Sequence, residues 1–454
     1  MTEREFKNML RRGLGGAIVE LKENPSRGKY RDVVMCCCLR NISYDWQVEG
    51  TRGHYLYSAI CTLGEKDYFE KVLIDKFLSR CSYKLILQLS DILSCYAGDG
   101  SEPARNAFYT KYNYFLAKNG RLLKNSSVDE GFQWQSIACS LFDIDGFSAF
   151  KRYAMDIGEL LNKSLPVYNP FYYEEFIFHA KVAFGKPRVH DFLEKMYGKS
   201  AGITALVDTL KKEELFRRQH QIGLEKEQVT IDYLVKTARE AASEENPRCK
   251  MIRFRQLFST HASEEELVEL AGIIFNEESE TSKALLLSVF WRKPFPLEIT
   301  KLIEYVHSGN ELLSESATRV LEESQDSRIH DVAIQMLKEK GFDSFALGLL
   351  KNNYQKADDG IIHQLLKKAS IVPQHVQGDV VDIYTCHRSV NALPILLHVY
   401  QRGECSHCRY GIVRAMAHCG VLPDEILWHC LYDSYEDTRK YAKRLIESRR
   451  KKQG

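Results

Sequence analysis

Apolar residues in the carboxyl-terminal half of the chain recur at helical spacing, and the predicted helices repeat. Three- and four-residue steps connect Cys405, Cys408, Ile412, Met416 and Cys419, and similar steps connect Thr438, Tyr441, Ala442, Leu445 and Ile446. Each set predicts an amphipathic helix with one buried stripe. Overlaying the two helices places Arg409 on Arg439, Ile412 on Ala442 and Met416 on Ile446, a shift of 30 residues each time.

The same period extends toward the amino terminus as two ladders of apolar residues. One ladder comprises Ala442, Ile412, Val381, Leu350, Ala317, Leu286 and Phe254, at intervals of 30 to 33 residues. The other comprises Leu427, Leu397, Leu366, Met336, Ile303, Ala271 and Ala238, at the same range of intervals. Helix breakers such as Pro247, Gly341, Pro373 and Gly403 fall between the helices on nearly the same period. Two ladders with one period predict two helices per repeat of about 31 residues.

The last helix carries a family resemblance. In Ser434–Leu445 an acidic residue precedes Arg439, and Ala442 and Leu445 follow at helical spacing, which resembles the second helix of a HEAT repeat. Asn310–Leu321 is a partial copy without the Arg. The short period is similar to the compact HEAT-like (armadillo-type) repeats of many bacterial proteins, and the resemblance covers residues 230–450. It implies an all-α superhelix of antiparallel helix pairs. It says little about activity, because such arrays serve as scaffolds, nucleic-acid binders and occasionally enzymes.

The amino-terminal half also predicts helices, with a looser rhythm and more aromatic residues. We expect helices at residues 29–41, 53–62, 68–80, 83–97, 104–119, 132–141, 147–162 and 171–184. The strongly charged stretch 204–242 predicts an exposed connecting helix. The expected organisation is an irregular helical region at 1–203, the connecting helix at 204–242 and the repeat array at 243–454. One continuous superhelix is the alternative.

Composition limits the location and the partners. A formal net charge of +2 on 454 residues gives no global electrostatic argument for nucleic acid or a membrane. The 13 cysteines, several of them on apolar stripes, indicate a reducing compartment. The first twelve residues are charged and lack the apolar core of a signal peptide, and no run approaches the roughly 18 apolar residues of a membrane helix. We therefore expect a cytoplasmic protein that does not bind a membrane.

Residues 405–430 contain the pattern closest to a metal site. Cys405-x-x-Cys408 with His407 is followed by His418-Cys419 and His429-Cys430, and zinc requires four such ligands. Cys405, Cys408 and Cys419 also occupy the predicted buried stripe, where free cysteine behaves as a small hydrophobic residue. We favour a reduced core and expect neither a metal nor a cofactor.

The polar, aromatic segment Asn41–Tyr55 lies between two apolar helices. Loops held by rigid helices often carry binding residues, so Asp45, Trp46, Glu49, Arg52 and His54 form a secondary candidate site. A catalytic site here requires Asp45, Glu49 and His54 to converge on one pocket. In the structural alternative, Trp46 fills a gap between helices while Glu49 pairs with Arg52. The chain has no phosphate-binding G-x-x-x-x-G-K-[ST] loop, and the glycine cluster Gly13-Leu14-Gly15-Gly16 lacks the strand of a dinucleotide site.

Basic residues recur on the second helix of each predicted repeat. In HEAT-like arrays these helices line the concave face, so their polar residues meet the ligand. The candidates for partner binding are Arg253, Arg255, Lys283, Arg319, Arg409, Arg414, Arg439 and Arg444. The segment 376–385 departs from this pattern, because it contributes Asp379 and Asp382. Such arginines also bridge to acidic residues of neighbouring repeats in many proteins.

The sequence therefore predicts a non-enzymatic α-solenoid scaffold that binds a protein partner through its concave face. The alternative is a nucleic-acid-binding protein similar to the HEAT-like DNA glycosylases, which would use these arginines with Trp291 or Trp428 against a base. Binding to duplex DNA that falls steeply with salt would favour the alternative.

Overall fold

The computed structural model describes residues 1–119, 128–163, 171–221, 229–343 and 345–453. Contacts between Cα atoms divide the chain into two compact units. Unit 1 consists of residues 1–220, 405–407 and 423–454, and unit 2 consists of residues 221–404 and 408–422. The described residues form helices and no strand, apart from an isolated bridge between Val372 and Gly403. The predicted all-α class is confirmed.

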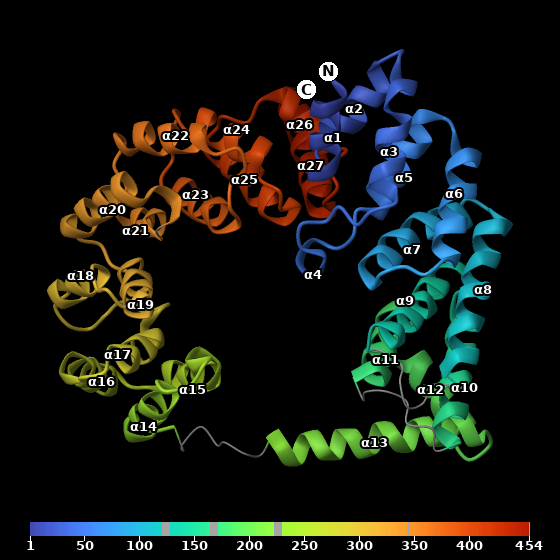
Figure 1. The fold of residues 1–454 in the computed structure, drawn as a ribbon, viewed down its shortest axis with the longest axis horizontal. Helices are drawn as coiled ribbons and strands as arrows, with labels where there is room; N and C mark the ends of the chain where they lie inside the picture. The colour runs from blue at the N-terminus through green and yellow to red at the C-terminus, as the bar shows by residue number, and fades with distance from the viewer. Residues whose placement is uncertain (120–127, 164–170, 222–228, 344, 454) are drawn as a thin grey trace. The chain divides into compact units, whose positions relative to one another are not determined.

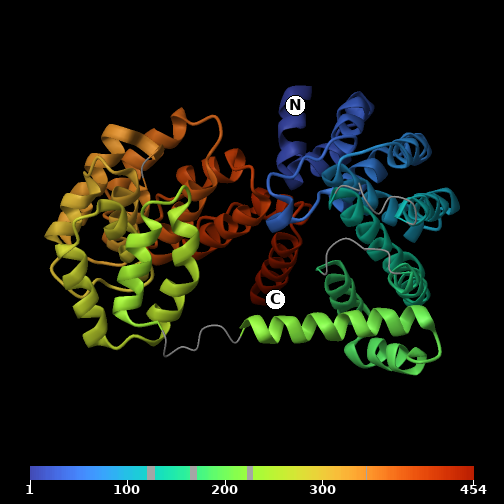
Figure 2. The same ribbon diagram turned by 60° about the horizontal axis from the view of Figure 1, so that its bottom comes forward.

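Unit 2 is a stack of consecutive helix pairs in two layers. In Figure 1, the first helices of the pairs form the outer layer and the second helices form the inner layer. The outer helices are α14 (Ile231–Ala241), α16 (Glu264–Asn276), α18 (Thr300–Val306), α20 (Ser327–Lys340), α22 (Asp358–Lys368) and α24 (Leu393–Arg402). The inner helices are α15 (Pro247–His261), α17 (Glu280–Leu287), α19 (Glu311–Leu321), α21 (Ala346–Asn353), α23 (Gln374–Cys386) and α25 (Ser406–His418). Figure 2 shows the same stack from another side.

The two ladders predicted from sequence map onto successive helices. Each of the fourteen ladder residues lies on a different helix from α14 to α27, and none is exposed. Ala317, Leu286, Leu366 and Ala442 are fully buried. The hydrophobic period therefore identified the helix pairs correctly, because each repeat buries its apolar stripe against its neighbours.

Local sequence explains where these helices begin. Ser263 and Glu266 form a reciprocal capping box at the start of α16. Asn310 accepts a hydrogen bond from the backbone N–H of Leu313 at the start of α19, and Asp326 does the same for Arg328 in α20. Pro247 occupies the first turn of α15, where its missing N–H costs nothing.

Polar contacts in unit 2 connect groups about one repeat apart. The Asn352 side-chain amide donates to the Glu322 carbonyl 30 residues earlier, and the Asn353 amide donates to the Ser324 carbonyl 29 residues earlier. Lys351 pairs with Glu323 across 28 residues at 3.1 Å. These bonds join the end of α21 to the segment that follows α19. Stacking of adjacent repeats is therefore fixed by specific hydrogen bonds as well as by apolar burial.

Unit 1 is also helical. Its first helices are α1 (Glu3–Arg12), α2 (Gly15–Glu23), α3 (Arg31–Cys38), α4 (Trp46–Glu49), α5 (Gly53–Leu63), α6 (Lys66–Leu78) and α7 (Tyr83–Gly98). They are followed by α8 (Glu102–Asn119), α9 (Val128–Asp145), α10 (Phe147–Asn162), α11 (Phe171–Phe184), α12 (Lys186–Met196) and α13 (Ala201–Gln221). Helices α3 and α5 to α11 lie close to the helices expected from sequence, whereas α1, α2, α4 and α12 were not expected. Phe142, Phe150, Phe176 and Tyr153 pack together in its core.

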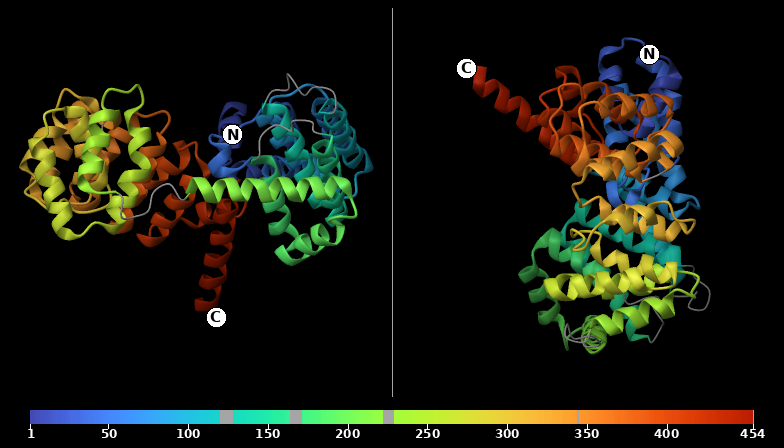
Figure 3. Two further views of the ribbon diagram at one scale, coloured as in Figure 1. Left: turned by 90° about the horizontal axis from the view of Figure 1, so that it is seen from below. Right: turned by 90° about the vertical axis from the view of Figure 1, so that its left-hand side faces the viewer.

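The charged stretch 204–242 is divided between two helices. α13 is one long helix that ends at Gln221, as Figure 3 shows, and α14 begins at Ile231 as the first helix of the first pair in unit 2. Part of the expected connecting helix, residues 222–228, lies outside the described residues.

The last helix pair belongs to unit 1, although it continues the period of the array. The pair consists of α26 (Asp424–Cys430) and α27 (Glu436–Gln453). α26 packs against α2, and the backbone N–H of Ser434 donates to the Gly13 carbonyl at 2.9 Å. A Cβ atom on Gly15 would lie 1.8 Å from the carbonyl oxygen of His429. The glycine cluster therefore allows close contact between these helices.

Candidate functional site

A pocket of about 550 Å³ opens on the inner layer of unit 2. Its lining comes from α15, from the segment after α17, from the end of α19, from Phe345 at the start of α21 and from α23, so five successive repeats surround one volume. Arg255, Trp291, Arg319, Glu322 and Asp379 supply its main polar and aromatic groups. The volume is within the range of ligand-binding pockets.

Trp291 is positioned by the end of α17 at Leu287, a few residues before it. After Leu287 the chain tightens into the 3₁₀ turn η3 (Ser288–Phe290), where the Ser288 hydroxyl donates to the Leu285 carbonyl. Pro294 and Pro296 follow shortly after Trp291 and prevent a further helical turn. The indole is thus held at the end of an inner helix, on the wall of the pocket.

Two guanidinium groups lie over the indole of Trp291. The central carbon of Arg255 is 4.2 Å from the ring centroid, and that of Arg319 is 4.6 Å from it. Arg319 is also 5.3 Å from the ring centroid of Phe345. Both distances to Trp291 are within the range of cation–π interactions, which favour tryptophan over other rings. The ring of Trp291 therefore holds two cations close to each other.

The arginines around Trp291 outnumber the carboxylates that pair with them. Glu315 pairs with Arg319 at 2.8 Å and also with Arg248. Within the described part of the chain, Arg255 and Arg292 have no carboxylate at ion-pair distance. Burial lowers the pKa of Arg255, and the nearby charges of Arg319, Arg248 and Arg292 lower it further. The pocket has an excess of positive charge.

Two carboxyl groups of the same pocket have raised pKa values. Burial raises the pKa of Glu322 to about 8, with a further contribution from Asp379. Burial and the neighbouring Asp382 raise the pKa of Asp379 to about 7. Arg319 opposes both shifts without reversing them. Near neutral pH these groups therefore carry protons that ordinary carboxyl groups have lost.

The position of Glu322 depends on the neighbouring repeat. Its backbone carbonyl accepts a hydrogen bond of 2.7 Å from Asn352, and its carboxylate lies against Gly348 on α21. A Cβ atom on Gly348 would be 2.6 Å from the carboxylate oxygen Oε1. The absence of a side chain at this position makes room for the acid.

The basic residues predicted to bind a partner have different surroundings in the structure. Arg255 and Arg319 meet at Trp291, whereas Lys283 lies 5.4 Å from the ring of Tyr305. Arg414 is exposed on α25, and its guanidinium lies 5.5 Å from the ring of Tyr410. The side chain of Arg253 lies outside the described residues.

Three of the eight have other roles or positions. Arg409 is 2% exposed, so it belongs to the core and corrects the expectation of a surface residue. Arg439 donates to the backbone carbonyls of Asp433 and Ser434 at 2.7 and 2.9 Å. Arg444 is exposed on α27, which is in unit 1 with Arg439. The helical periodicity predicted that these arginines lie on helices, but it did not predict which groups their side chains contact.

The loop residues of unit 1 form a buried ion pair. Glu49 accepts hydrogen bonds from Arg52 at 3.1 and 3.2 Å and from the backbone N–H and hydroxyl of Ser406 at 2.7 and 2.6 Å. Burial alone would raise the pKa of Glu49, but Arg52 and these hydrogen bonds lower it. The predicted pairing of Glu49 with Arg52 is therefore observed.

The other members of this loop have separate positions. Asp45 caps α4, and the ring of Trp46 packs edge-on against Tyr83 at 5.5 Å. His54 is exposed at the start of α5. Asp45, Glu49 and His54 thus do not share the convergent pocket that the catalytic interpretation requires.

The cysteines and histidines of residues 405–430 each contact different groups. Cys405 and Cys430 are buried, and Cys419 contacts the Tyr384 carbonyl at 3.4 Å. His407 bonds to the hydroxyl of Tyr435 at 2.8 Å, and Arg388 donates to His418 at 3.3 Å.

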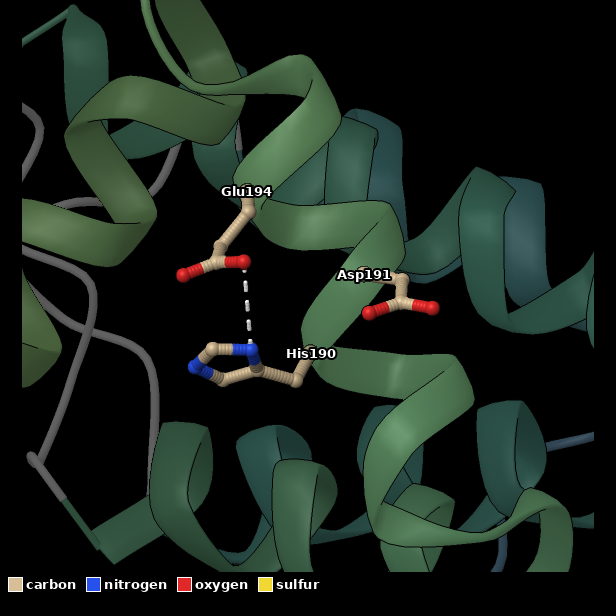
Figure 4. Close-up of side chains that lie close together, drawn as sticks. All are labelled: His190, Asp191 and Glu194. Carbon is tan, nitrogen blue, oxygen red and sulfur yellow. Dashed lines mark ion pairs between the residues drawn. The ribbon is translucent and has the colours of Figure 1, made fainter.

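Among the described residues, the group with ligand atoms close enough for a metal is His190, Asp191 and Glu194 on α12. Figure 4 shows Glu194 facing the His190 ring, with 3.4 Å between Nδ1 and Oε2, and Asp191 to the right of both side chains. All three side chains are exposed, and exposed acidic groups commonly occur without a metal. This arrangement is explained by a surface ion pair at helical i, i+4 spacing.

Comparisons with known proteins add no functional information. No protein-family model matches the chain, and a search of curated proteins gives no match. Among solved structures, an engineered protein from the Northeast Structural Genomics Consortium aligns over 98% of both chains with 15% identity and a TM-score of 0.23. A TM-score this low carries no argument.

Sequence reasoning missed the acidic half of the pocket. Asp379 was noted only as a departure from the basic pattern, and Glu322 was not singled out. The available signal was an acidic residue at the end of one inner helix, followed one repeat later by a helical glycine, Gly348.

No helix in the described ranges is long and apolar enough to cross a membrane.

Proposed function

We propose that unit 2 is a non-enzymatic HEAT-like binding scaffold that holds a protein partner against its inner helices, with the Trp291 pocket as the anchor. The observation that carries this proposal is the meeting of Arg255, Arg319 and Trp291 from three successive inner helices or their ends. Aromatic and arginine side chains in a pocket are the groups that dominate protein–protein binding energies.

The repeat architecture supports this role. Each helix pair packs mainly on its neighbours, so the polar side chains of the inner layer remain available to a ligand. Ile252 is 48% exposed at the pocket and offers an apolar contact beside the charged groups. A protein segment provides both apolar and polar groups to such a surface.

Nucleic-acid binding is the second candidate, and the arginine cluster is the observation in its favour. Phosphate contacts require basic side chains and give strong salt dependence. Two guanidinium groups already lie over the Trp291 ring, which leaves this indole a poor platform for a base. Trp428 is 48% exposed on α26 and provides the other ring considered for that role.

The test is affinity capture from the native host with tagged full-length protein. We compare the wild type, the double variant Arg255→Glu/Arg319→Glu and the matched control Arg402→Glu, which reverses an exposed arginine on the outer helix α24. The wild type and the control should retain the same partner, identified by mass spectrometry and confirmed with purified protein. The double variant should lose it, while circular dichroism shows that its helices persist.

Two outcomes contradict this function. Retention of the partner by the double variant would place the interface elsewhere. Binding to generic duplex DNA that falls steeply between low and moderate salt, and that the double variant loses, would favour nucleic acid instead.

A further inference from the structure

The Trp291 pocket combines cations and carboxyl groups in unequal number. Arg255, Arg292 and Arg319 line it together with Glu322 and Asp379. Glu315, outside the lining, is shared between Arg319 and Arg248 and cannot neutralise the other arginines. The side chains that line the pocket carry this excess positive charge, which is the arrangement expected for binding an anion.

The guanidinium groups are also held in fixed orientations. Arg255 and Arg319 stack against the same indole, and Arg319 is further restrained by Glu315 at 2.8 Å. A planar guanidinium donates two parallel hydrogen bonds to a carboxylate or phosphate. Restraining the donors before the ligand arrives reduces the entropy lost on binding.

We infer that the Trp291 pocket binds the oxyanion of an acidic peptide segment, either a carboxylate or a phosphate ester, and binds it more tightly at mildly acidic than at alkaline pH. This inference rests on the proposed scaffold function and specifies the chemistry of the partner. Arg255 and Arg292 would donate to the oxyanion, and Ile252 and Phe345 would contact apolar parts of the peptide.

The pH dependence follows from the acids that face the arginines. The charged groups that act on the Glu322 carboxyl are Arg319 on α19, Glu323 directly after it, Lys351 on α21 and Asp379 on α23. Asp379 has Asp382 on its own helix and Arg319 across the pocket, and the exposed His375 also lines the site. Lys351 is occupied by Glu323 at 3.1 Å. When Glu322 and Asp379 ionise, their charges repel the oxyanion and offset Arg319, whereas their protonated forms are neutral.

The experiment measures binding of fluorescein-labelled short peptides to the full chain by fluorescence anisotropy. One peptide contains glutamates, a second contains phosphoserine in their place, and a third contains glutamine as the neutral control. The glutamate or the phosphoserine peptide should bind, and the glutamine peptide should bind about tenfold more weakly or not at all. The stronger of the two acidic peptides identifies the source of the oxyanion.

Variants then assign the binding to the pocket. Arg255→Gln should weaken the acidic peptide about tenfold or more, since it removes a charged hydrogen-bond donor. Arg402→Gln, the exposed control on the outer helix α24, should leave the affinity unchanged. Equal binding of acidic and neutral peptides, no binding of any peptide, or equal losses in both variants would overturn the inference.

The pH arm uses the glutamate peptide, because its side chains stay ionised over the whole interval. Affinity of the wild type should fall between about pH 6 and about pH 9, as the pKa values of about 8 and about 7 require. Glu322→Gln/Asp379→Asn should remove most of this change. A host partner that is lost by Arg255→Glu/Arg319→Glu, combined with no peptide binding, would reject this inference while leaving the scaffold function in place.

Discussion

At the residue scale, two acids of this protein have opposite pKa shifts. The side chain of Glu49 is buried beside Arg52 and also accepts hydrogen bonds from Ser406, so its pKa is lowered. Glu322 is half-buried near Arg319 and Lys351, but these cations already pair with Glu315 and Glu323. The pKa of Glu322 is therefore raised to about 8. Availability of the nearest cation, rather than burial alone, determines which acid is ionised.

This shift predicts a pH-dependent difference in stability between the wild type and Glu322→Gln. Between the ordinary pKa of 4.5 and the folded value of about 8, the folded state binds more protons than the unfolded state. Stability of the wild type relative to the variant therefore falls as pH rises through this interval. We expect the variant to gain on the order of 1–2 kcal/mol at about pH 9, allowing for solvent screening, and little at about pH 5. Urea unfolding at both pH values measures it, and an equal difference at both would contradict the assignment.

At the element scale, glycine determines how closely helices approach one another. Gly15 at the start of α2 lies against the backbone of α26 around His429, where any side chain would collide. Gly348 on α21 makes room for the carboxylate of Glu322 in the same way. In contrast, Gly272 in the middle of α16 has open space around its Cβ position. Helical glycines in this chain therefore have different consequences that depend on the facing element.

Replacing Gly15 by alanine should destabilise unit 1. The new Cβ atom would lie 1.8 Å from a backbone oxygen, which cannot move without separating α2 from α26. We expect a loss of about 1–3 kcal/mol, the usual range for overpacking. The matched control Gly272→Ala should stabilise its helix by up to about 1 kcal/mol, because alanine is the better helix former. Denaturant unfolding of both variants tests this, and equal effects would show that the α2–α26 contact is not formed.

At the scale of the whole molecule, the last helix pair follows the repeat array in sequence but packs in unit 1. Leu427 and Ala442 continue the period of the array, yet their helices α26 and α27 belong to unit 1 with α1 and α2. The Ser434 N–H bond to the Gly13 carbonyl joins residues from the two ends of the chain. The terminal helix pair therefore packs on the amino-terminal helices through α26, which contacts α2.

Removal of residues 423–454 should consequently affect the amino-terminal helices. In a chain that ends at Leu422, amide hydrogen exchange should increase in α2, which loses its packing against α26. Helices α16 to α19 of unit 2 serve as the internal control and should keep their protection. Unchanged exchange in α2 would contradict the assignment of α26 to unit 1.

The sequence by itself determined the all-α class and, in the carboxyl-terminal half, the helices, their pairing and the period of the array. These properties depend on residues three, four and about 31 positions apart, so they are visible as spacing, and each ladder residue lies on its own helix. Only the tertiary structure decided what individual side chains do. Arg409 and Arg414 lie on the same helix, yet one is buried and the other exposed. The Trp291 pocket needs Arg255, Arg319, Glu322 and Asp379 from three different repeats, and their contacts depend on how helices stack, which local spacing does not specify.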